Sequence, residues 1–155
     1  MKLTWRTEYA LLAMVTIARA AEGAFVPADQ IAKDHGIPQR FLEQILFSLK
    51  RGGYLRSMKG QHGGYALARP ASRITLAELL RFLGGALAPT ESVSQFFYQA
   101  TPVAREPSLL AVFREIRDYA ARRLEETTLA DVVARRAVGR RPTRKRKTQQ
   151  KGVQI

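Results

Sequence analysis

Four side chains that can form hydrogen bonds with base pairs share one face of a short predicted helix. The helix follows Pro38, and its apolar residues recur at the spacing of one buried face, Phe41, Leu42, Ile45, Leu46 and Leu49. The four polar side chains fall largely on the opposite face, at Gln39, Arg40, Glu43 and Gln44. Arginine can bond guanine, glutamine can bond adenine, and glutamate can accept a hydrogen bond from cytosine. Because many solvated helices carry such residues, an ordinary pair of packed helices stays open for this segment taken alone.

The elements around this helix predict a helix-turn-helix. A short helix is expected over residues 29–34, and Gly36 supplies a tight turn where positive φ is tolerated. Pro38 suits the first turn of the second helix, because its missing N–H has no partner there. The glycines at 52–53 end the second helix. Two cations that suit a helix C-terminus precede that end, Lys50 and Arg51, and both are also candidate DNA contacts.

A basic, glycine-rich hairpin is predicted directly after the second helix. Two short runs, 54–58 and 65–68, flank a six-residue tip. The tip consists of Lys59, Gly60, Gln61 and His62, followed by two more glycines. The candidate DNA contacts in the hairpin are Arg56, Lys59, Gln61 and His62. Such a hairpin after a helix-turn-helix is typical of a wing, which lies along the phosphate backbone or in the minor groove. We interpret His62 as a donor to phosphate or water, and His35 as a packing and hydrogen-bonding residue at the turn.

Composition points to a polyanionic partner and excludes several kinds of chemistry. The chain has 155 residues, with 26 Lys and Arg against 13 Asp and Glu and a net charge of +13. Its pI is near 10.9, which favours nucleic acid ahead of an anionic membrane. The chain has no cysteine and only two histidines, so disulfides, thiolate catalysis and metal binding are not expected. No run of apolar residues is long enough to predict a membrane span.

The excess charge is concentrated at the C-terminal end. Residues 135–155 contain nine basic residues and no acid, which leaves 17 basic and 13 acidic residues in 1–134. Large apolar residues are almost absent there, so we expect a disordered basic tail. It is either a solubilising tail or an arm that binds phosphates without sequence preference.

The first predicted helix resembles a secretory signal but is expected to be part of the core. An apolar run begins at Ala10 and follows Lys2 and Arg6, which superficially fits an exported chain. Glu8 at the edge of the run and Arg19 in the would-be cleavage motif argue against export. The run also forms a helical stripe that needs a packing partner. We therefore expect a cytoplasmic protein.

The second half of the chain predicts further helices around an aromatic loop. Capping boxes are expected at Thr75 with Glu78 and at Thr128 with Asp131. Residues 86–107 contain three prolines and are predicted as mostly loop, with one helical turn. This loop carries aromatic residues that suit core packing or, as the alternative, an apolar small molecule, Phe96, Phe97 and Tyr98. A long helix from Ser108 follows, with a stripe that predicts dimerisation, Leu109, Val112, Phe113, Ile116, Ala120 and Leu124.

The sequence resembles the Rrf-type winged helix-turn-helix regulators, which include IscR, NsrR and CymR. Matching residues span about 1–85, at 1–4, 9–10, 31–32, 36–38, 41–46, 49–50, 53–55, 60–68 and 74–78. The resemblance implies a homodimer that binds double-stranded DNA at a pseudo-palindromic operator. It places the helix after Pro38 in the major groove, the hairpin around Lys59 in the minor groove, and the long helix against its dimer mate.

Two departures from the family limit what the resemblance implies. Many relatives have an arginine and a Gly-Pro-Gly-Gly-Gly wing tip, where this chain has residues 59–64. Cluster-binding relatives place three cysteines in the region that corresponds to 86–107, and this chain has none. Glu8 occupies the place of an acidic ligand in some members, but without thiolates we interpret it as structural. We expect no iron–sulfur cluster, no metal and no other cofactor.

These observations predict a mainly α fold with a small β-hairpin, and a regulator of transcription. We expect a winged helix-turn-helix DNA-binding domain over 1–85, an effector loop and dimerisation helices over 86–134, and the basic tail over 135–155. The function we expect is sequence-specific repression by a homodimer, with any small-molecule effector unidentified. An architectural nucleic-acid protein and a protein-interaction adaptor are the alternatives. An enzyme is disfavoured because no nucleophile–base or paired-carboxylate constellation emerges.

Overall fold

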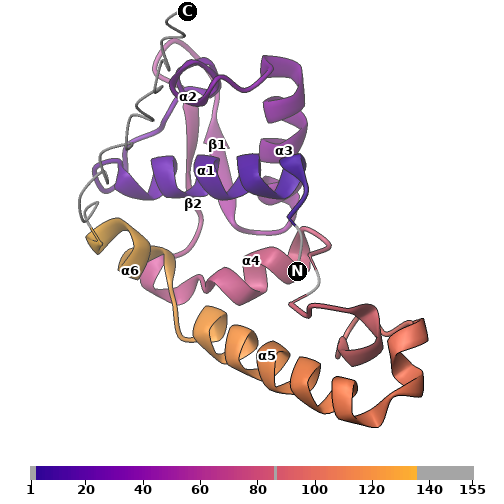
Figure 1. Ribbon diagram of the computed structural model, residues 1–155. Coiled ribbons are helices and arrows are strands. Elements are labelled where there is room, and N and C mark those ends of the chain that lie inside the picture. The colour runs from indigo at the N-terminus through magenta and orange to yellow at the C-terminus, as the bar shows by residue number, and fades with distance from the viewer. Residues whose placement is uncertain (1–2, 86, 136–155) are drawn as a thin grey trace, which may run out of the picture.

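The described residues form a helical body with one two-stranded hairpin and a long helix that leads away from it (Figure 1). The computed structural model describes residues 3–85 and 87–135. In chain order the helices and strands are α1 (Trp5–Arg19), α2 (Ala28–His35), α3 (Gln39–Arg51), β1 (Leu55–Met58), β2 (Gly64–Leu67), α4 (Leu76–Phe82), α5 (Pro107–Glu125) and α6 (Leu129–Ala134). Three short 3₁₀ turns lie between them, Ala71–Arg73, Glu91–Val93 and Pro102–Arg105. The mainly α fold with a hairpin that the sequence predicts is confirmed.

Helix α1 is a core helix, as its apolar stripe predicts. The Thr4 side chain caps it by accepting a hydrogen bond from the Thr7 N–H at 3.2 Å. Its buried apolar residues recur at helical spacing, Ala10, Ala13, Met14 and Ile17. They meet the inner faces of α2 and α3 in one cluster. In the described part of the chain, no helix has the length and apolar character that crossing a membrane requires.

The predicted helix-turn-helix is present as α2, a glycine turn and α3. Gly36 adopts φ 63°, ψ 32°, a left-handed conformation that favours glycine, and its N–H closes α2 onto the Ala32 carbonyl. Pro38 is the N-cap of α3 rather than its first helical residue, so α3 begins at Gln39. The inner face of α3 is buried, at Leu42, Ile45, Leu46 and Leu49. These residues fix which face α3 presents to solvent.

The hairpin packs its base against the core and pairs with a third piece of chain. Strands β1 and β2 are antiparallel, with Leu55 opposite Leu67 and Met58 opposite Gly64. Tyr65 and Val26 exchange backbone hydrogen bonds of 2.8 and 2.9 Å. A Cβ at Gly64 would lie 2.3 Å from the Val26 carbonyl oxygen, so only glycine allows this approach. The two glycines at the end of the tip, Gly63 and Gly64, therefore allow close backbone contacts that determine the shape of the wing.

One predicted capping box is complete and the other is half formed. At α6, the Thr128 hydroxyl accepts from the Asp131 N–H at 3.2 Å and Asp131 accepts from the Thr128 N–H at 2.8 Å. At α4, Thr75 accepts from the Glu78 N–H at 3.2 Å. The Glu78 carboxylate pairs with the Arg69 guanidinium instead of reaching back to the cap. A tertiary ion pair thus replaces the local contact that the sequence pattern predicts.

Helix α6 returns to the body after α5 has left it. The Leu129 N–H donates to the Ile74 carbonyl at 2.9 Å, and the Leu76 N–H donates to the Thr127 carbonyl at 2.9 Å. The Leu129 side chain is fully buried in the same cluster as α1 and α3. Figure 1 shows α6 beside α1, with α5 running from it toward the lower right. The end of the described chain therefore completes the core that its first half begins.

The segment that leads into α5 has an exposed aromatic cluster. It contains two 3₁₀ turns, Glu91–Val93 and Pro102–Arg105, where the sequence predicts mostly loop and one turn. Phe96, Phe97 and Tyr98 are 66%, 42% and 66% exposed. The expectation that these rings pack in the core is therefore wrong for the protomer. The predicted basic tail, apart from Arg135, lies outside the described residues.

Candidate nucleic-acid interface

The outer face of α3 presents the four predicted base-reading side chains to solvent. Gln39, Arg40, Glu43 and Gln44 are all exposed, while the opposite face is buried. The Gln39 amide donates to the Glu43 carboxylate at 3.2 Å, one helical turn away. This contact leaves Arg40 and Gln44 without an intrahelical partner among the described residues. The face thus offers a guanidinium and an amide as free hydrogen-bonding groups.

An aromatic residue that the sequence pattern did not single out lies on the same face. Phe47 is 58% exposed and lines a shallow hollow with Arg40, Glu43, Gln44 and Tyr65. The guanidinium carbon of Arg51 lies 5.9 Å from the centre of its ring. Helical spacing alone could have identified Phe47 as part of this face, because it follows Glu43 by four residues and Gln44 by three.

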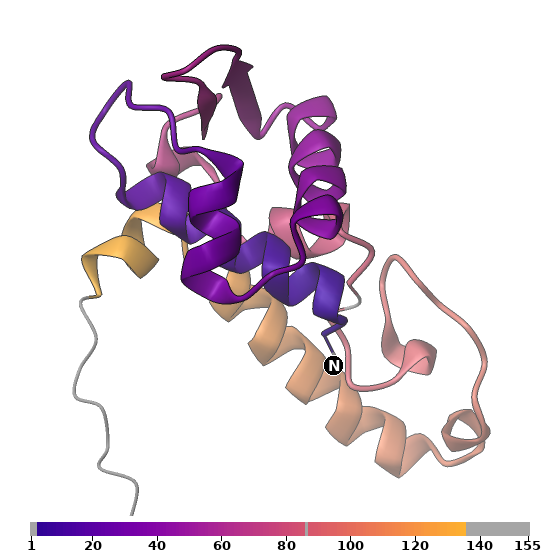
Figure 2. The ribbon, with the colours of Figure 1, turned by 90° about the horizontal axis from the view of Figure 1, so that it is seen from above.

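The C-terminal end of α3 is joined to the wing by a side-chain hydrogen bond. The Lys50 ammonium donates to the Ser57 hydroxyl of β1 at 2.6 Å. Lys50, Ser57 and Lys59 line one groove between α3 and the hairpin. At the tip, Lys59, Gln61 and His62 are exposed. Figure 2 shows α3 and the hairpin next to each other at the top, so the predicted contacts of helix and wing share one side of the molecule.

Arg56 is the predicted contact that the structure does not bring together with the others. Its neighbour Ser57 faces α3, and successive strand residues point to opposite faces. The Arg56 guanidinium carbon lies 4.6 Å from the centre of the Phe25 ring, and its Nε donates to the Leu67 carbonyl at 3.4 Å. Arg56 therefore packs on the face of the hairpin that points away from α3.

Two contacts from α1 hold the helix-turn-helix in place. The Arg6 guanidinium donates to the Ser48 hydroxyl of α3 at 2.9 Å, which adds an exposed cation beside α3 that the sequence pattern did not assign. The His35 Nε2 atom lies 2.7 Å from the Thr16 hydroxyl. This bond confirms the expectation that His35 is a packing and hydrogen-bonding residue at the turn.

The base of the wing is fixed to α4 through a buried tyrosine. Tyr54 follows α3 directly, and the Arg69 guanidinium carbon lies 4.9 Å from the centre of its ring. Burial raises the pKa of the Tyr54 phenol above its ordinary value of 10.0, and the Glu78 charge adds to the rise while Arg69 opposes it. The wing is thus anchored by an uncharged tyrosine and an ion pair at neutral pH.

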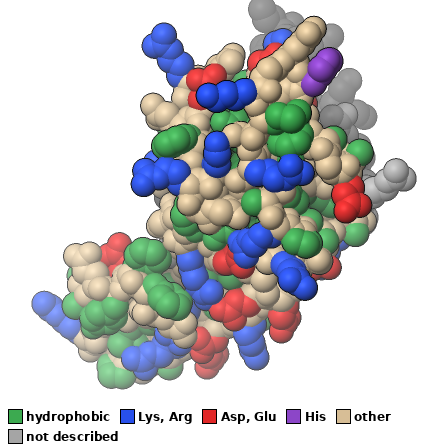
Figure 3. Space-filling model, turned by 180° about the vertical axis from the view of Figure 1, so that it is seen from behind, with side chains coloured by type: hydrophobic (Ala, Val, Ile, Leu, Met, Phe, Trp, Pro, Cys, Tyr) green, Lys and Arg blue, Asp and Glu red, His purple; other side chains and the backbone are tan. Residues whose placement is uncertain are grey.

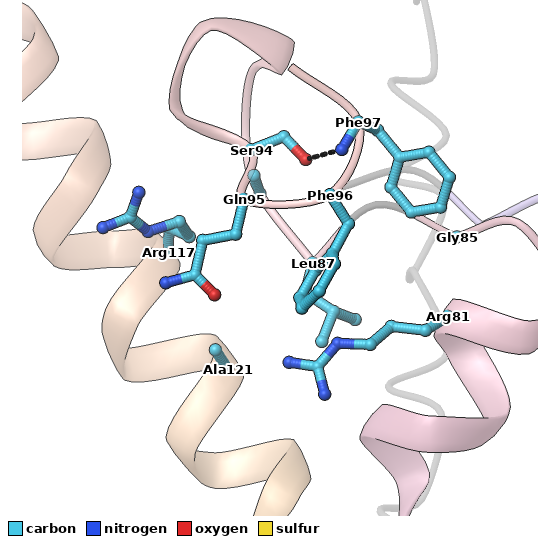
Figure 4. A pocket seen from close by; sticks show the side chains of 10 residues that line it. Arg81, Gly85, Leu87, Ser94, Gln95, Phe96, Phe97, Arg117 and Ala121 are labelled. Atoms are coloured by element: carbon cyan, nitrogen blue, oxygen red, sulfur yellow. Dashed lines mark hydrogen bonds between the residues drawn. The ribbon is translucent and has the colours of Figure 1, made fainter.

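In the described part of the region expected to receive any effector, a very small cavity is present. It lies between α4, α5 and the aromatic segment, with Arg81, Phe96, Arg117 and Ala121 among its lining residues (Figure 4). Its volume is about 10 Å³, close to the space that one water molecule needs. Among the described residues the buried Nε of Arg81 has no hydrogen-bond partner, so this cavity suits a water better than a metabolite in this conformation.

The predicted stripe of α5 is divided between two faces. Leu109, Val112 and Ile116 are exposed, whereas three members are half-buried against the protein's own chain, Phe113, Ala120 and Leu124. Tyr119, which the sequence pattern omitted, is 67% exposed and extends the outer face. Figure 3 shows hydrophobic side chains gathered at the lower left, on the lobe that includes the start of α5.

Comparison with known proteins decides the family. The Rrf2 family, described as an iron-dependent transcriptional regulator, matches residues 3–135. The chain belongs to the Rrf2 family. Rv1287 of Mycobacterium tuberculosis strain H37Rv, provisionally named an HTH-type transcriptional regulator, is 40% identical over 134 residues, which is 85% of this chain and 81% of that protein. The regulator CymR of Bacillus subtilis is 27% identical over 134 residues, covering 86% of this chain and 91% of CymR.

Solved structures of the Rrf2 family confirm the winged-helix fold. The structure of B. subtilis CymR, titled the global cysteine regulator, superposes with a TM-score of 0.69 at 26% identity. It covers 86% of this chain and 97% of CymR. T. potens IscR has the same fold, with a TM-score of 0.65 at 24% identity over 90% of this chain and 94% of IscR. This Rrf2 protein therefore has the DNA-binding fold of a family of transcriptional regulators.

Proposed function

We propose that this Rrf2 protein binds a specific DNA sequence as a homodimer and represses transcription from it. The observation that carries the proposal is the outer face of α3, where Gln39, Arg40, Glu43 and Gln44 are exposed over a buried apolar face. An α-helix fits the major groove, where such side chains distinguish base pairs. The hydrogen bond between Lys50 and Ser57 holds the wing beside α3, so that Lys59 reaches the neighbouring backbone or minor groove.

The outer stripe of α5 supports the homodimer. Leu109, Val112, Ile116 and Tyr119 recur at intervals of three and four residues, which places them on one helical face. All four are exposed in the protomer. An apolar face of this kind marks an interaction site, and a two-fold dimer buries the same face on both protomers. Two α3 helices would then read half-sites separated by about one helical turn of DNA or a multiple of it.

An iron centre is not included in the proposed mechanism, although the family description names iron. The chain has no cysteine to supply the thiolates on which clusters are built. In residues 3–85 and 87–135, no three histidine, aspartate or glutamate side chains gather as metal ligands would. Glu8, at the place of an acidic ligand in some relatives, lies in the first turn of α1, where its charge suits the helix dipole. The residues present do not fit an iron site.

Selection from a random pool of duplexes, with an iron chelator present throughout, tests the proposal. The full chain should enrich a pseudo-palindromic sequence with half-sites spaced by about one helical turn. Its affinity for that duplex should exceed its affinity for a scrambled duplex by at least about a thousandfold at physiological salt. An affinity ratio near one would favour an architectural protein, and absence of DNA binding would favour an interaction adaptor. Repression is tested by placing the selected sequence over the promoter of a reporter gene.

A further inference from the structure

Phe47 is an apolar ring in the middle of a polar face. It lies one helical turn beyond Gln44 on α3, and more than half of its side-chain surface is exposed. The core beneath it is complete without it, because Leu42, Ile45 and Leu49 are buried on the opposite face. Its ring borders the same shallow hollow as Arg40 and Gln44. A molecule that occupies this hollow would therefore bury the Phe47 ring.

If α3 lies in the major groove as proposed, helix geometry puts the ring near a neighbouring base pair. The rise of an α-helix is about 1.5 Å per residue, so Phe47 lies about 4.5 Å along the axis from Gln44 and about 10 Å from Arg40. Successive base pairs are about 3.4 Å apart. With α3 along the major groove, Phe47 would face a base pair one or two steps from the one that Gln44 contacts.

The major-groove edges of the bases offer one apolar group of the right kind. Besides hydrogen-bond donors and acceptors, they present the C5 position of the pyrimidines, which carries only hydrogen in cytosine and a methyl group in thymine that phenylalanine can contact. A phenyl ring placed against a donor or acceptor would leave that group without water or partner. A methyl group at C5 of a modified cytosine has the same chemistry.

We propose that Phe47 is a specificity-determining residue that packs against the C5 methyl group of a pyrimidine in each half-site. This inference rests on the proposed binding of α3 to DNA. The Arg51 guanidinium lies beside the Phe47 ring, and because its positive charge attracts phosphates it favours a position of the ring close to the DNA backbone. The selected sequence should therefore contain a thymine one or two base pairs from the pair that Gln44 reads.

Removing single methyl groups from the DNA tests the contact. Each thymine of a labelled duplex carrying the selected sequence is replaced in turn by deoxyuridine, which keeps every hydrogen-bonding group. At one position per half-site the wild-type protein should lose about fourfold in affinity, the equivalent of about 0.8 kcal/mol for one buried methyl group at 1.4 kcal/mol per tenfold. Phe47→Ala should bind the thymine and uracil duplexes equally, and Phe47→Leu should keep part of the difference.

Matched controls separate this contact from general damage. Phe96→Ala removes a similarly exposed ring from the segment before α5 and should keep the full response to uracil. At the responsive position, a 5-methylcytosine pair should bind better than a cytosine pair by the same factor if the methyl group alone is read. An equal response of wild type and Phe47→Ala at every position would overturn the inference while leaving DNA binding intact. If no sequence is enriched at all, the proposed function fails first.

Discussion

The body and the α5 region differ in whether their apolar side chains are buried. In the body, Met14, Ile31 and Leu46 are fully buried between α1, α2 and α3. Helix α5, although longer than any of these, has no buried residue among its 19. Its exposed stripe includes Val112 and Ile116. The difference shows that the body supplies its own core, whereas α5 leaves an apolar face that a second protomer is expected to cover.

The two regions also differ in what holds them together. The segment before α5 is organised by hydroxyl groups, because the Ser92 Oγ atom lies 2.6 Å from the Thr101 Oγ1 atom and accepts from the Thr101 N–H at 2.7 Å. The Arg117 guanidinium of α5 donates to the Val93 carbonyl at 2.7 Å. These polar contacts add to a small apolar cluster, in which Leu87 of this segment packs with Ala77 and Leu80 of α4. The segment therefore depends on fewer buried apolar side chains than the body does.

The largest expected effect compares one substitution from each region. Leu46→Ala should lower the free energy of unfolding by about 2–5 kcal/mol, because it opens a cavity in a fully buried site. Ile116→Ala should change it by less than about 0.5 kcal/mol in dilute protein, where the stripe faces water. Denaturant unfolding at several protein concentrations measures both. A cost for Ile116→Ala that equals that of Leu46→Ala in dilute protein would contradict the comparison.

A charge in the outer stripe should weaken the dimer selectively. Ile116→Asp places a carboxylate in the proposed interface on both protomers, where burial without a partner is unfavourable. The dimer dissociation constant should rise by at least about tenfold, equivalent to about 1.4 kcal/mol, while the fold of the protomer is kept. Sedimentation over a concentration series measures it. Glu115→Gln, at an exposed neighbouring position, is the control and should leave the dissociation constant within about twofold.

Removal of the basic tail should change non-specific binding more than specific binding. Truncation after Ala134 deletes nine cations and no acid. If the tail binds phosphates, the slope of log affinity against log salt should fall by about 0.9 for each phosphate that it engages. Affinity for scrambled DNA should fall with it, and the preferred sequence should stay the same. An unchanged slope would identify the tail as a solubilising segment.

The smallest expected effect concerns the cap that returns the chain to the body. Thr128→Ala should lower the free energy of unfolding by about 1 kcal/mol, because the Asp131 N–H loses its capping acceptor. Hydrogen bonds from the Thr128 hydroxyl and backbone lower the pKa of Asp131 below its ordinary value of 3.8. The contribution of the carboxylate is thus present above that value and is lost as the pH falls through the lowered pKa.

Asp131→Asn checks the sign of this pH dependence. Its stability difference from wild type should be present at neutral pH and should shrink as the pH falls below 3.8, where the wild-type carboxyl group also becomes neutral. Denaturant unfolding at a series of pH values measures the difference. A difference that grows toward acid pH would contradict the assigned cause.

Local patterns in the sequence predict the body well because its elements are defined by local chemistry. The apolar period of α3, the left-handed glycine at Gly36 and the Thr128 cap each depend on a few neighbouring residues. The pairing of Glu78 with Arg69 and the return of Leu129 to the core involve residues far apart in the chain, so no local pattern contains them. These contacts depend on the assembled fold.

The candidate site shows the same division between local and distant information. The polar face of α3 follows from helical spacing, but attention to hydrogen-bonding residues passes over an apolar ring such as Phe47. Arg56 has the charge and the position in the sequence that a wing contact needs. Only its tertiary contact with Phe25 shows that its side chain points away from α3. Exposure of Phe96 is likewise invisible to composition, since large apolar residues are usually buried.

Specific and non-specific binding by α3 variants test the central claim most directly. Arg40→Ala and Gln44→Ala are compared with Arg122→Ala, which removes an exposed cation from α5, on the selected duplex and on a scrambled one. Each α3 variant should lose about 1–3 kcal/mol on the selected duplex, roughly five- to 150-fold, with little change on the scrambled duplex. Arg122→Ala should behave as wild type on the selected duplex. Equal losses of both α3 variants on the two duplexes would contradict the assignment of α3 as the helix that reads DNA.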